Sequence, residues 1–114
     1  MISIIGAGPA GATAAMNLAD SFEVCLFEEH KEIGSPVACT GILTDSLKDH
    51  LKIKNDYIIN KIKKFRVFGE KEDTSFTVKK RNIILDRKKF DQHLVQEAID
   101  KGAKLHTSHR LERI

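Results

Sequence analysis

Two short apolar runs near the start of the chain flank a segment rich in small residues. The runs are Met1 to Ile5 and Val24 to Phe27, and such runs are typical of parallel strands buried on both faces of a sheet. Pro9 lies in the first turn of a helix between them, where its missing N–H costs little. One face of that helix carries side chains suited to close packing on a sheet: Ala10, Ala14, Ala15, Leu18 and Ala19. The pattern predicts a strand, a helix and a second, parallel strand.

A second helical pattern lies near the end of the chain. Arg87 to Lys101 repeats apolar residues at helical spacing, and Asp86 before it is a favourable N-cap. Gly102 directly after it is a typical helix stop. Ala103 to Thr107 then predicts a third parallel strand, and Leu111 to Ile114 begins another element. The apolar face of the helix is expected to consist of Phe90, Leu94, Val95 and Ala98.

Between these two patterns the chain is first polar and then rich in β-forming residues. Glu29 to Asp45 is punctuated by Gly and Pro and predicts a loop. A short helix is expected at Leu47, Leu51 and Ile53. Short strands are expected at Phe65 to Phe68, Ser75 to Val78 and Ile83 to Leu85, with a turn at Glu70 to Asp73. We interpret residues 58–85 as a small antiparallel insertion on the main sheet.

The turn between the first strand and the first helix has the spacing G-x-G-x-x-G. Gly6 permits a tight turn, Gly8 lets the backbone approach a pyrophosphate, and Gly11 lets the helix pack closely on the sheet. The helix N-terminus presents N–H groups and a positive dipole end to phosphates. Glu28 ends the second strand, where a carboxylate accepts a hydrogen bond from a ribose hydroxyl. These features predict binding of an ADP-containing dinucleotide; the alternative is a Gly-rich turn without a ligand.

Composition restricts the class of protein. The chain has 114 residues, 41% hydrophobic and 31% charged, which suits one small globular domain. No stretch approaches the ~18 consecutive apolar residues of a membrane span, and the N-terminal run lacks the basic flank of a signal peptide. Cys25 and Cys39 make no disulfide framework, so we expect a cytoplasmic protein. The five histidines lack metal-ligand spacing, so we assign no metal.

The net charge of +3 does not by itself indicate nucleic acid. Basic residues cluster at Lys61, Lys63 and Lys64 and again at residues 79–81, without the interleaved aromatic residues of a base-stacking surface. We interpret both clusters as solvated strand ends and expect no nucleic-acid partner. The alternative is a patch that faces an anionic membrane surface or a phosphate-bearing substrate.

Two further features bear on the ligand. The loop from Ile33 to Gly41 follows the ribose carboxylate, and its Gly and Pro residues suit a backbone that runs along an extended ligand, which favours FAD over NAD. Within it, Cys39 lies either beside the flavin or in a tight loop as a buried thiol. Arg87, at the start of a helix, either forks to phosphate oxygens or pairs with Asp91 at i+4 as a surface arginine.

These segments together resemble the N-terminal part of the geranylgeranyl reductase family of flavoproteins, which includes archaeal digeranylgeranylglycerophospholipid reductases. The resemblance rests on residues 6–11, 27–41, 85–94 and 98–103, and the loop Ile-Gly-Ser-Pro-Val-x-Cys is its most specific part. It covers essentially the whole chain. It implies an α/β fold, the N-terminal portion of a Rossmann-like FAD-binding fold over residues 1–114, with a β-rich insertion at about 58–85.

The resemblance also implies a function. Members of the family hold FAD and reduce isolated double bonds of polyprenyl lipids. For this protein we expect a location in the cytoplasm or peripherally at the membrane. Leu111 would meet the adenine through its backbone. The residues expected to contact the cofactor are Gly6, Gly8, Pro9, Ala10, Gly11, Glu28, Cys39, Thr40, Gly41, Arg87 and Leu111. Such reductases often read Cys-Gly-Glu-Gly where this chain reads Cys39-Thr-Gly41-Ile, which bears on the substrate more than on the cofactor.

Family members are several times longer than this chain. We therefore expect a fragment that lacks the second Gly-Asp motif and the substrate cavity, associates with itself and is inactive alone as a reductase. Two alternatives remain open: another flavoprotein of the same fold, either monooxygenase-like or electron-transferring, and a non-catalytic remnant that binds nucleotide weakly or not at all.

Overall fold

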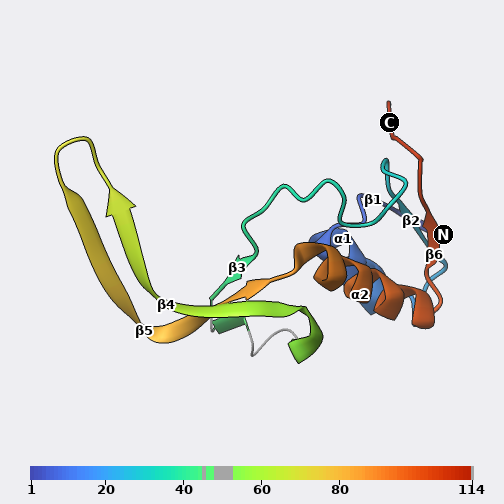
Figure 1. Cartoon of the computed structure of the whole chain (residues 1–114). Coiled ribbons are helices and arrows are strands. Elements are labelled where there is room, and N and C mark those ends of the chain that lie inside the picture. The colour runs from blue at the N-terminus through green and yellow to red at the C-terminus, as the bar shows by residue number, and fades with distance from the viewer. Residues whose placement is uncertain (45, 48–52, 114) are drawn as a thin grey trace. The chain divides into compact units, whose positions relative to one another are not determined.

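The computed structural model describes residues 1–44, 46–47 and 53–113 and divides the chain into two compact units. Unit 1 comprises residues 1–38 and 87–114, and unit 2 comprises residues 39–86. In Figure 1 unit 1 carries the blue and the orange-to-red ends of the colour scale, and unit 2 the colours between them. Each unit is described by itself.

Unit 1 contains the parallel sheet that the apolar runs predict. Its strands are β1 (Ile2–Ile5), β2 (Val24–Phe27) and β6 (Lys104–His106), in the order β1-β2-β6. Ile2 aligns with Val24, and Cys25 aligns with Lys104. The α/β fold class and the third parallel strand predicted from the sequence are therefore confirmed.

Two helices connect these strands. α1 (Pro9–Leu18) links β1 to β2, and α2 (Arg87–Asp100) precedes β6. Both crossovers step in the same direction along the sheet, so the right-handed rule puts both helices on one face, and they pack on each other. Gly102, with φ of 103°, ends α2 as predicted. The predicted apolar face of α2 is buried: Phe90, Leu94, Val95 and Ala98.

β1 departs from the expectation of a strand buried on both faces. Ile2 and Ile4 are half-buried, whereas Ser3 is exposed and Ile5 is 51% exposed. Ile4 lies on the helix side, since its Cγ2 atom is 3.4 Å from where a Cβ on Gly11 would sit. The helices cover only one face of the described sheet, and β1 is an edge strand, so alternate side chains remain open to solvent.

Unit 2 is built on an antiparallel sheet of its own. Its elements are β3 (Ile42–Leu43), a 3₁₀ turn η2 (Asn55–Tyr57), β4 (Ile58–Phe68) and β5 (Asp73–Leu85). The strand order is β3-β5-β4, separate from the parallel sheet. The prediction of an insertion on the main sheet is therefore wrong, although its antiparallel pairing is confirmed.

The number of strands in this region was also mispredicted. Ser75–Val78 and Ile83–Leu85 belong to one strand, β5, since the exposed basic residues between them stay extended. A register shift between Ile62 and Lys64 accommodates this stretch. β3 lies within the segment that we predicted to be loop throughout, because Ile42 and Leu43 pair with β5.

The remaining predictions concern short segments. The chain turns at residues 69–72, where the Gly69 N–H donates to the Glu72 carbonyl oxygen over 3.2 Å. Of the predicted short helix, Leu47 lies in a 3₁₀ turn and Ile53 is not helical, whereas Leu51 lies outside the described residues, as does Ile114. Leu111 to Arg113 form no strand. Within the described ranges, no helix is both long enough and apolar enough to cross a membrane.

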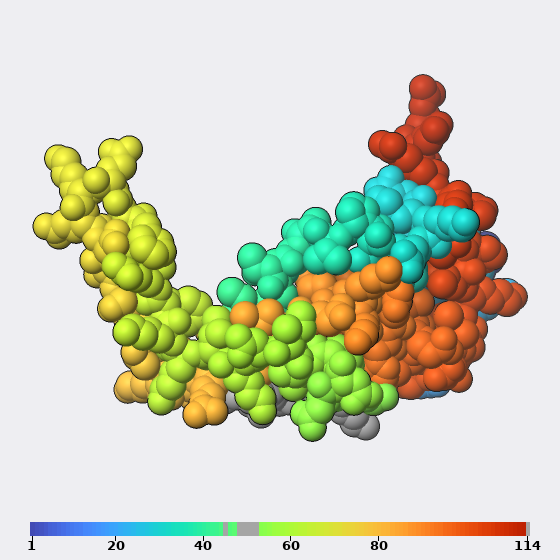
Figure 2. Space-filling view, viewed as in Figure 1, coloured from blue at the N-terminus to red at the C-terminus, as the bar shows by residue number. Residues whose placement is uncertain are grey.

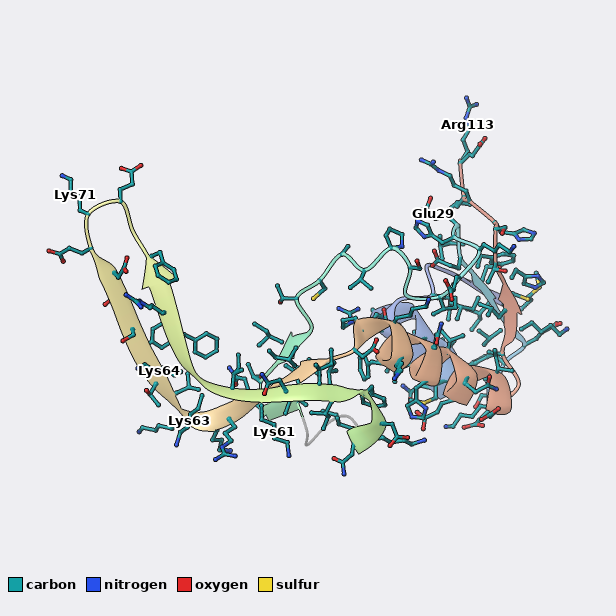
Figure 3. All side chains as sticks on the ribbon, in the orientation of Figure 1. Glu29, Lys61, Lys63, Lys64, Lys71 and Arg113 are labelled. Carbon is teal, nitrogen blue, oxygen red and sulfur yellow. The ribbon has the colours of Figure 1, made fainter. Side chains whose placement is uncertain are left out.

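The β4–β5 hairpin carries the basic clusters and several exposed apolar side chains. Lys61, Lys63 and Lys64 are exposed along β4, in the interior of the strand rather than at its end (Figure 3). Towards the turn the hairpin forms a narrow arm (Figure 2). In it β4 pairs with β5, and Phe65 and Phe76 stack with ring centroids 5.3 Å apart. The basic side chains are solvated, as we interpreted them, but they are not strand ends.

Candidate functional site: a dinucleotide cradle in unit 1

Three glycines shape the turn between β1 and α1. Gly6 has φ of 93°, a left-handed conformation that glycine adopts without strain. Its N–H donates to the Phe27 carbonyl oxygen over 2.7 Å. A Cβ on Gly11 would overlap the carbonyl oxygen of Gly6, whereas a Cβ on Gly8 would meet no atom within 4 Å. The tight turn and the close packing are thus as predicted, and the space beside Gly8 is open.

The N-terminus of α1 directly follows this turn. Gly8 is the N-cap and Pro9 the first helical residue, and no side chain caps the helix. The Ala12 N–H donates to the Gly8 carbonyl oxygen over 2.9 Å. The N–H groups of Ala10 and Gly11 come before this hydrogen bond, where a helix offers no intrahelical acceptor. Together with the positive end of the helix dipole, they make a site suited to a phosphate.

Glu28 follows β2 and is hydrogen-bonded to the same turn. Its Oε2 accepts the Ala7 N–H over 2.9 Å, and its Oε1 accepts the His30 N–H over 3.0 Å and lies 2.7 Å from His30 Nδ1. Partial burial raises the pKa of Glu28, but the hydrogen bonds from Ala7 and His30 outweigh it and hold this pKa below its ordinary value. A carboxylate has about four acceptor positions, so Glu28 has capacity for a ligand hydroxyl.

A polar pocket of about 140 Å³ adjoins the turn and Glu28. Its lining comes from the glycine turn, the end of β2, the loop that follows and α2: Ala7, Gly8, Glu28, His30, Gly34, Ser35, Pro36 and Asp91. All these residues belong to unit 1. Gly34 has φ of 73°, and a Cβ there would lie 2.8 Å from the Lys88 Cα atom. The loop therefore packs directly on the backbone of α2.

The first turn of α2 holds a forked ion pair. Arg87 Nε donates to Asp91 Oδ1, and Arg87 Nη2 donates to Asp91 Oδ2, each over 3.0 Å. Asp91 is only 6% exposed, so this is not the surface pair that the sequence suggested as one alternative. Pairing with Asp91 is present in the structure, and a contact between Arg87 and a cofactor stays a prediction.

Leu111 does not line the pocket of Gly8 and Glu28. It lines an apolar pocket of about 300 Å³ with Ser3, Ile5, Phe27, His109 and Arg110. Ser3 and Ile5 alternate with the helix-facing residues of β1, so this pocket lies on the sheet face opposite the helices. The expected backbone contact of Leu111 with an adenine stays a prediction.

Cys39, Thr40 and Gly41 belong to unit 2. Gly41 has φ of 72°, and its N–H donates to Cys39 Sγ over 3.4 Å. Its carbonyl oxygen accepts the Leu85 N–H over 2.9 Å, which ties the loop to β5. Cys39 is exposed, which contradicts the alternative of a buried thiol. Contact of these three residues with a cofactor stays a prediction.

Sequence reasoning missed His30 as part of the site. We treated it as one of five scattered histidines, yet both its backbone and its ring contact Glu28. The signal available was its position two residues after Glu28, where the chain has just left β2 and can fold back on the carboxylate. Among residues 1–44, 46–47 and 53–113, no group of three or more potential metal ligands gathers.

The sequence of this chain is similar to a family model and to known proteins. Residues 4–42 match the model of an NAD(P)-binding Rossmann-like domain. A digeranylgeranylglycerophospholipid reductase of Methanosarcina acetivorans is 34% identical over 96% of this chain and 28% of its own length. An uncharacterized protein in the nifH2 5′ region of Methanosarcina barkeri is 35% identical over 99% of this chain and 67% of its own length.

Solved structures agree with these relatives. A geranylgeranyl bacteriochlorophyll reductase-like protein from Thermoplasma acidophilum superposes with a TM-score of 0.79 at 31% identity, over 93% of this chain and 29% of that protein. A halogenase in complex with phloroglucinol and FAD shares the fold, with a TM-score of 0.66 at 16% identity. The chain spans 28% of the Methanosarcina acetivorans reductase that it matches. The chain corresponds to the N-terminal portion of the geranylgeranyl reductase family.

Proposed function

We propose that unit 1 binds the ADP half of FAD, as part of a flavin-dependent reductase of isoprenoid lipids. The observation that carries this proposal is the hydrogen bond from the Ala7 N–H to the Glu28 carboxylate, 2.9 Å long. It joins the expected ribose acceptor to the expected phosphate turn. A ligand with a ribose and a diphosphate in sequence matches that arrangement.

The residues present fit such a ligand. The open space beside Gly8 admits a diphosphate close to the backbone, and the first N–H groups of α1 supply donors to it. Glu28 would accept a hydrogen bond from a ribose hydroxyl, and its negative charge would repel a 2′-phosphate. FAD supplies hydride chemistry when bound. This chain's residues bind and orient the nucleotide end.

Further contacts belong to the same proposal. Arg87 would contact the diphosphate, and the backbone of Leu111 would contact the adenine. The loop of Cys39, Thr40 and Gly41 would contact the flavin. An isoprenoid lipid is proposed as the substrate because the similar protein of Methanosarcina acetivorans is a digeranylgeranylglycerophospholipid reductase. Both the lipid substrate and the reductase reaction are proposed for a protein that combines this chain with the remaining portion found in the matched relatives.

Titration of the chain with ADP and with FAD tests the nucleotide part. We expect saturable binding of both ligands, and weaker binding of both to Glu28→Ala. Failure of the wild-type chain to bind ADP would contradict the proposed nucleotide binding. A chimera tests the proposed FAD binding and lipid reduction. In it this chain replaces the matching portion of the Methanosarcina acetivorans reductase. A folded chimera that retains FAD and reduces the lipid supports the proposal, and a folded chimera without FAD opposes it.

A further inference from the structure

We propose that Asp91 is a positioning residue, which holds the Arg87 guanidinium at the pocket where the diphosphate of the nucleotide lies. The inference rests on the proposed nucleotide binding and adds the residue that orients the arginine. Its basis is the forked pair between the two side chains together with the place of Asp91 in the pocket wall.

The fork fixes the plane of the guanidinium. Arg87 offers five N–H donors in a rigid, planar array. Both oxygens of Asp91 accept from it, one from Nε and one from Nη2, each over 3.0 Å. Two parallel hydrogen bonds hold a guanidinium in one orientation, which a single contact does not. The side chain is therefore preorganised before any ligand arrives.

Asp91 places this arginine beside the pocket of Gly8 and Glu28. Asp91 lines that pocket, and the Arg87 guanidinium is hydrogen-bonded to Asp91. The wall is held in place by Gly34, whose close approach to Lys88 leaves no room for a side chain. Gln92 Nε2 also donates to the Ile33 carbonyl oxygen over 3.3 Å, which ties the loop to α2 a second time.

The ion pair of Arg87 and Asp91 also affects the charge of the pocket wall. Asp91 is 6% exposed, and an unpaired carboxylate in this wall would repel a diphosphate. Paired with Arg87 it adds no net charge to the wall. A guanidinium matches phosphate oxygens through directed N–H donors, which a lysine ammonium replaces only as a point charge. The pair thus turns a repulsive position into one that accepts an anion.

The test compares two ligands on the intact 114-residue chain. ADP carries the diphosphate, and adenosine shares only its base and ribose. We expect Asp91→Asn to lower ADP affinity by about tenfold or more, as for the loss of a charged hydrogen bond, with adenosine affinity unchanged. Arg87→Lys should show the same selectivity, and the double variant should lose little more than either single variant. Asp100→Asn, the same change at the exposed far end of α2, is the matched control.

Four outcomes are informative. A selective loss of ADP affinity, partly restored in Asp91→Glu, supports the proposal. An equal loss of ADP and adenosine affinity in Asp91→Asn shows a merely structural role for Asp91 and overturns the proposal. Equal affinity of the wild-type chain for ADP and adenosine overturns it as well. Failure of the wild-type chain to bind ADP overturns the proposed function and this inference with it. Far-ultraviolet circular dichroism verifies that each variant is folded, and Arg87→Lys replaces Asp91→Asn in the comparison if the latter is not.

Discussion

The Glu28 carboxylate accepts the backbone N–H of Ala7 over 2.9 Å, so the end of β2 is hydrogen-bonded to the turn that follows β1. These two residues lie at the same edge of neighbouring parallel strands, because β1 and β2 align in register from Ile2 and Val24 onward. The contact makes the proposed acceptor for a ribose and the proposed phosphate-binding turn parts of one hydrogen-bonded unit.

Replacement of Glu28 by alanine should weaken ADP binding by about 1–3 kcal/mol, the range for loss of a hydrogen bond to a charged group. Isothermal titration calorimetry measures the difference. Glu29→Ala is the matched control, because Glu29 is exposed and its partner Arg110 lies 3.7 Å away. Equal affinity of wild type and Glu28→Ala would remove Glu28 from the site.

Acid should destabilise the wild-type chain more than Glu28→Gln. Hydrogen bonds from Ala7 and His30 hold the folded-state pKa of Glu28 below its ordinary value despite partial burial. The unfolded state therefore takes up the proton first. The stabilisation is fully present above the ordinary glutamate pKa of about 4.3 and is lost as the pH falls through the folded-state pKa. Denaturant unfolding between about pH 7 and about pH 3 measures it, and parallel curves for both proteins would contradict the prediction.

Two glycine substitutions should separate folding from binding. Gly11→Ala places a Cβ on the Gly6 carbonyl oxygen, and such overpacking costs about 1–3 kcal/mol of unfolding free energy. Gly8→Ala meets no neighbouring atom and has φ of −70°, which alanine accepts. It should change stability by about 0.5 kcal/mol at most yet weaken ADP binding, since its methyl group occupies the space for the diphosphate. If Gly8→Ala binds ADP like the wild type, the diphosphate does not lie there.

The open edge of β1 should make the chain associate with itself. β1 pairs only with β2 in the described chain, and its outward residues Ser3 and Ile5 are exposed. Ser3→Lys puts a charge on this edge, which discourages strand pairing. Light scattering across a concentration series should show less association for Ser3→Lys than for the wild type. Ser21→Lys, in an exposed turn, is the control, and equal association of all three proteins would place the contact elsewhere.

The parallel core could be predicted because each of its signals is local. Each signal spans a short stretch of sequence: the apolar runs, the glycine spacing and the apolar face of α2. The structure has the corresponding elements nearly at the predicted bounds. The site near Glu28 could be predicted only in part. Gly34 and Asp91 meet in one pocket although they are far apart in sequence, and no periodicity encodes such a meeting.

The errors have a common physical origin. Apolar content predicted burial for β1, but burial depends on what covers the strand, and the described chain covers one face only. Charged content between Val78 and Asn82 predicted a break in the strand, but exposed basic side chains are compatible with extended backbone. In both cases the local pattern was correct and the neighbouring element decided the outcome.

The close packing of Gly34 on Lys88 has a consequence for how the chain tolerates change in length. The two segments of unit 1 are held together at this contact, on either side of residues 39–86. For a loop whose ends are fixed, the entropy of closure grows only with the logarithm of its length, by about 0.6 kcal/mol per doubling. Residues 39–86 can therefore lengthen, shorten or exchange their strands during evolution with little effect on the folding of unit 1.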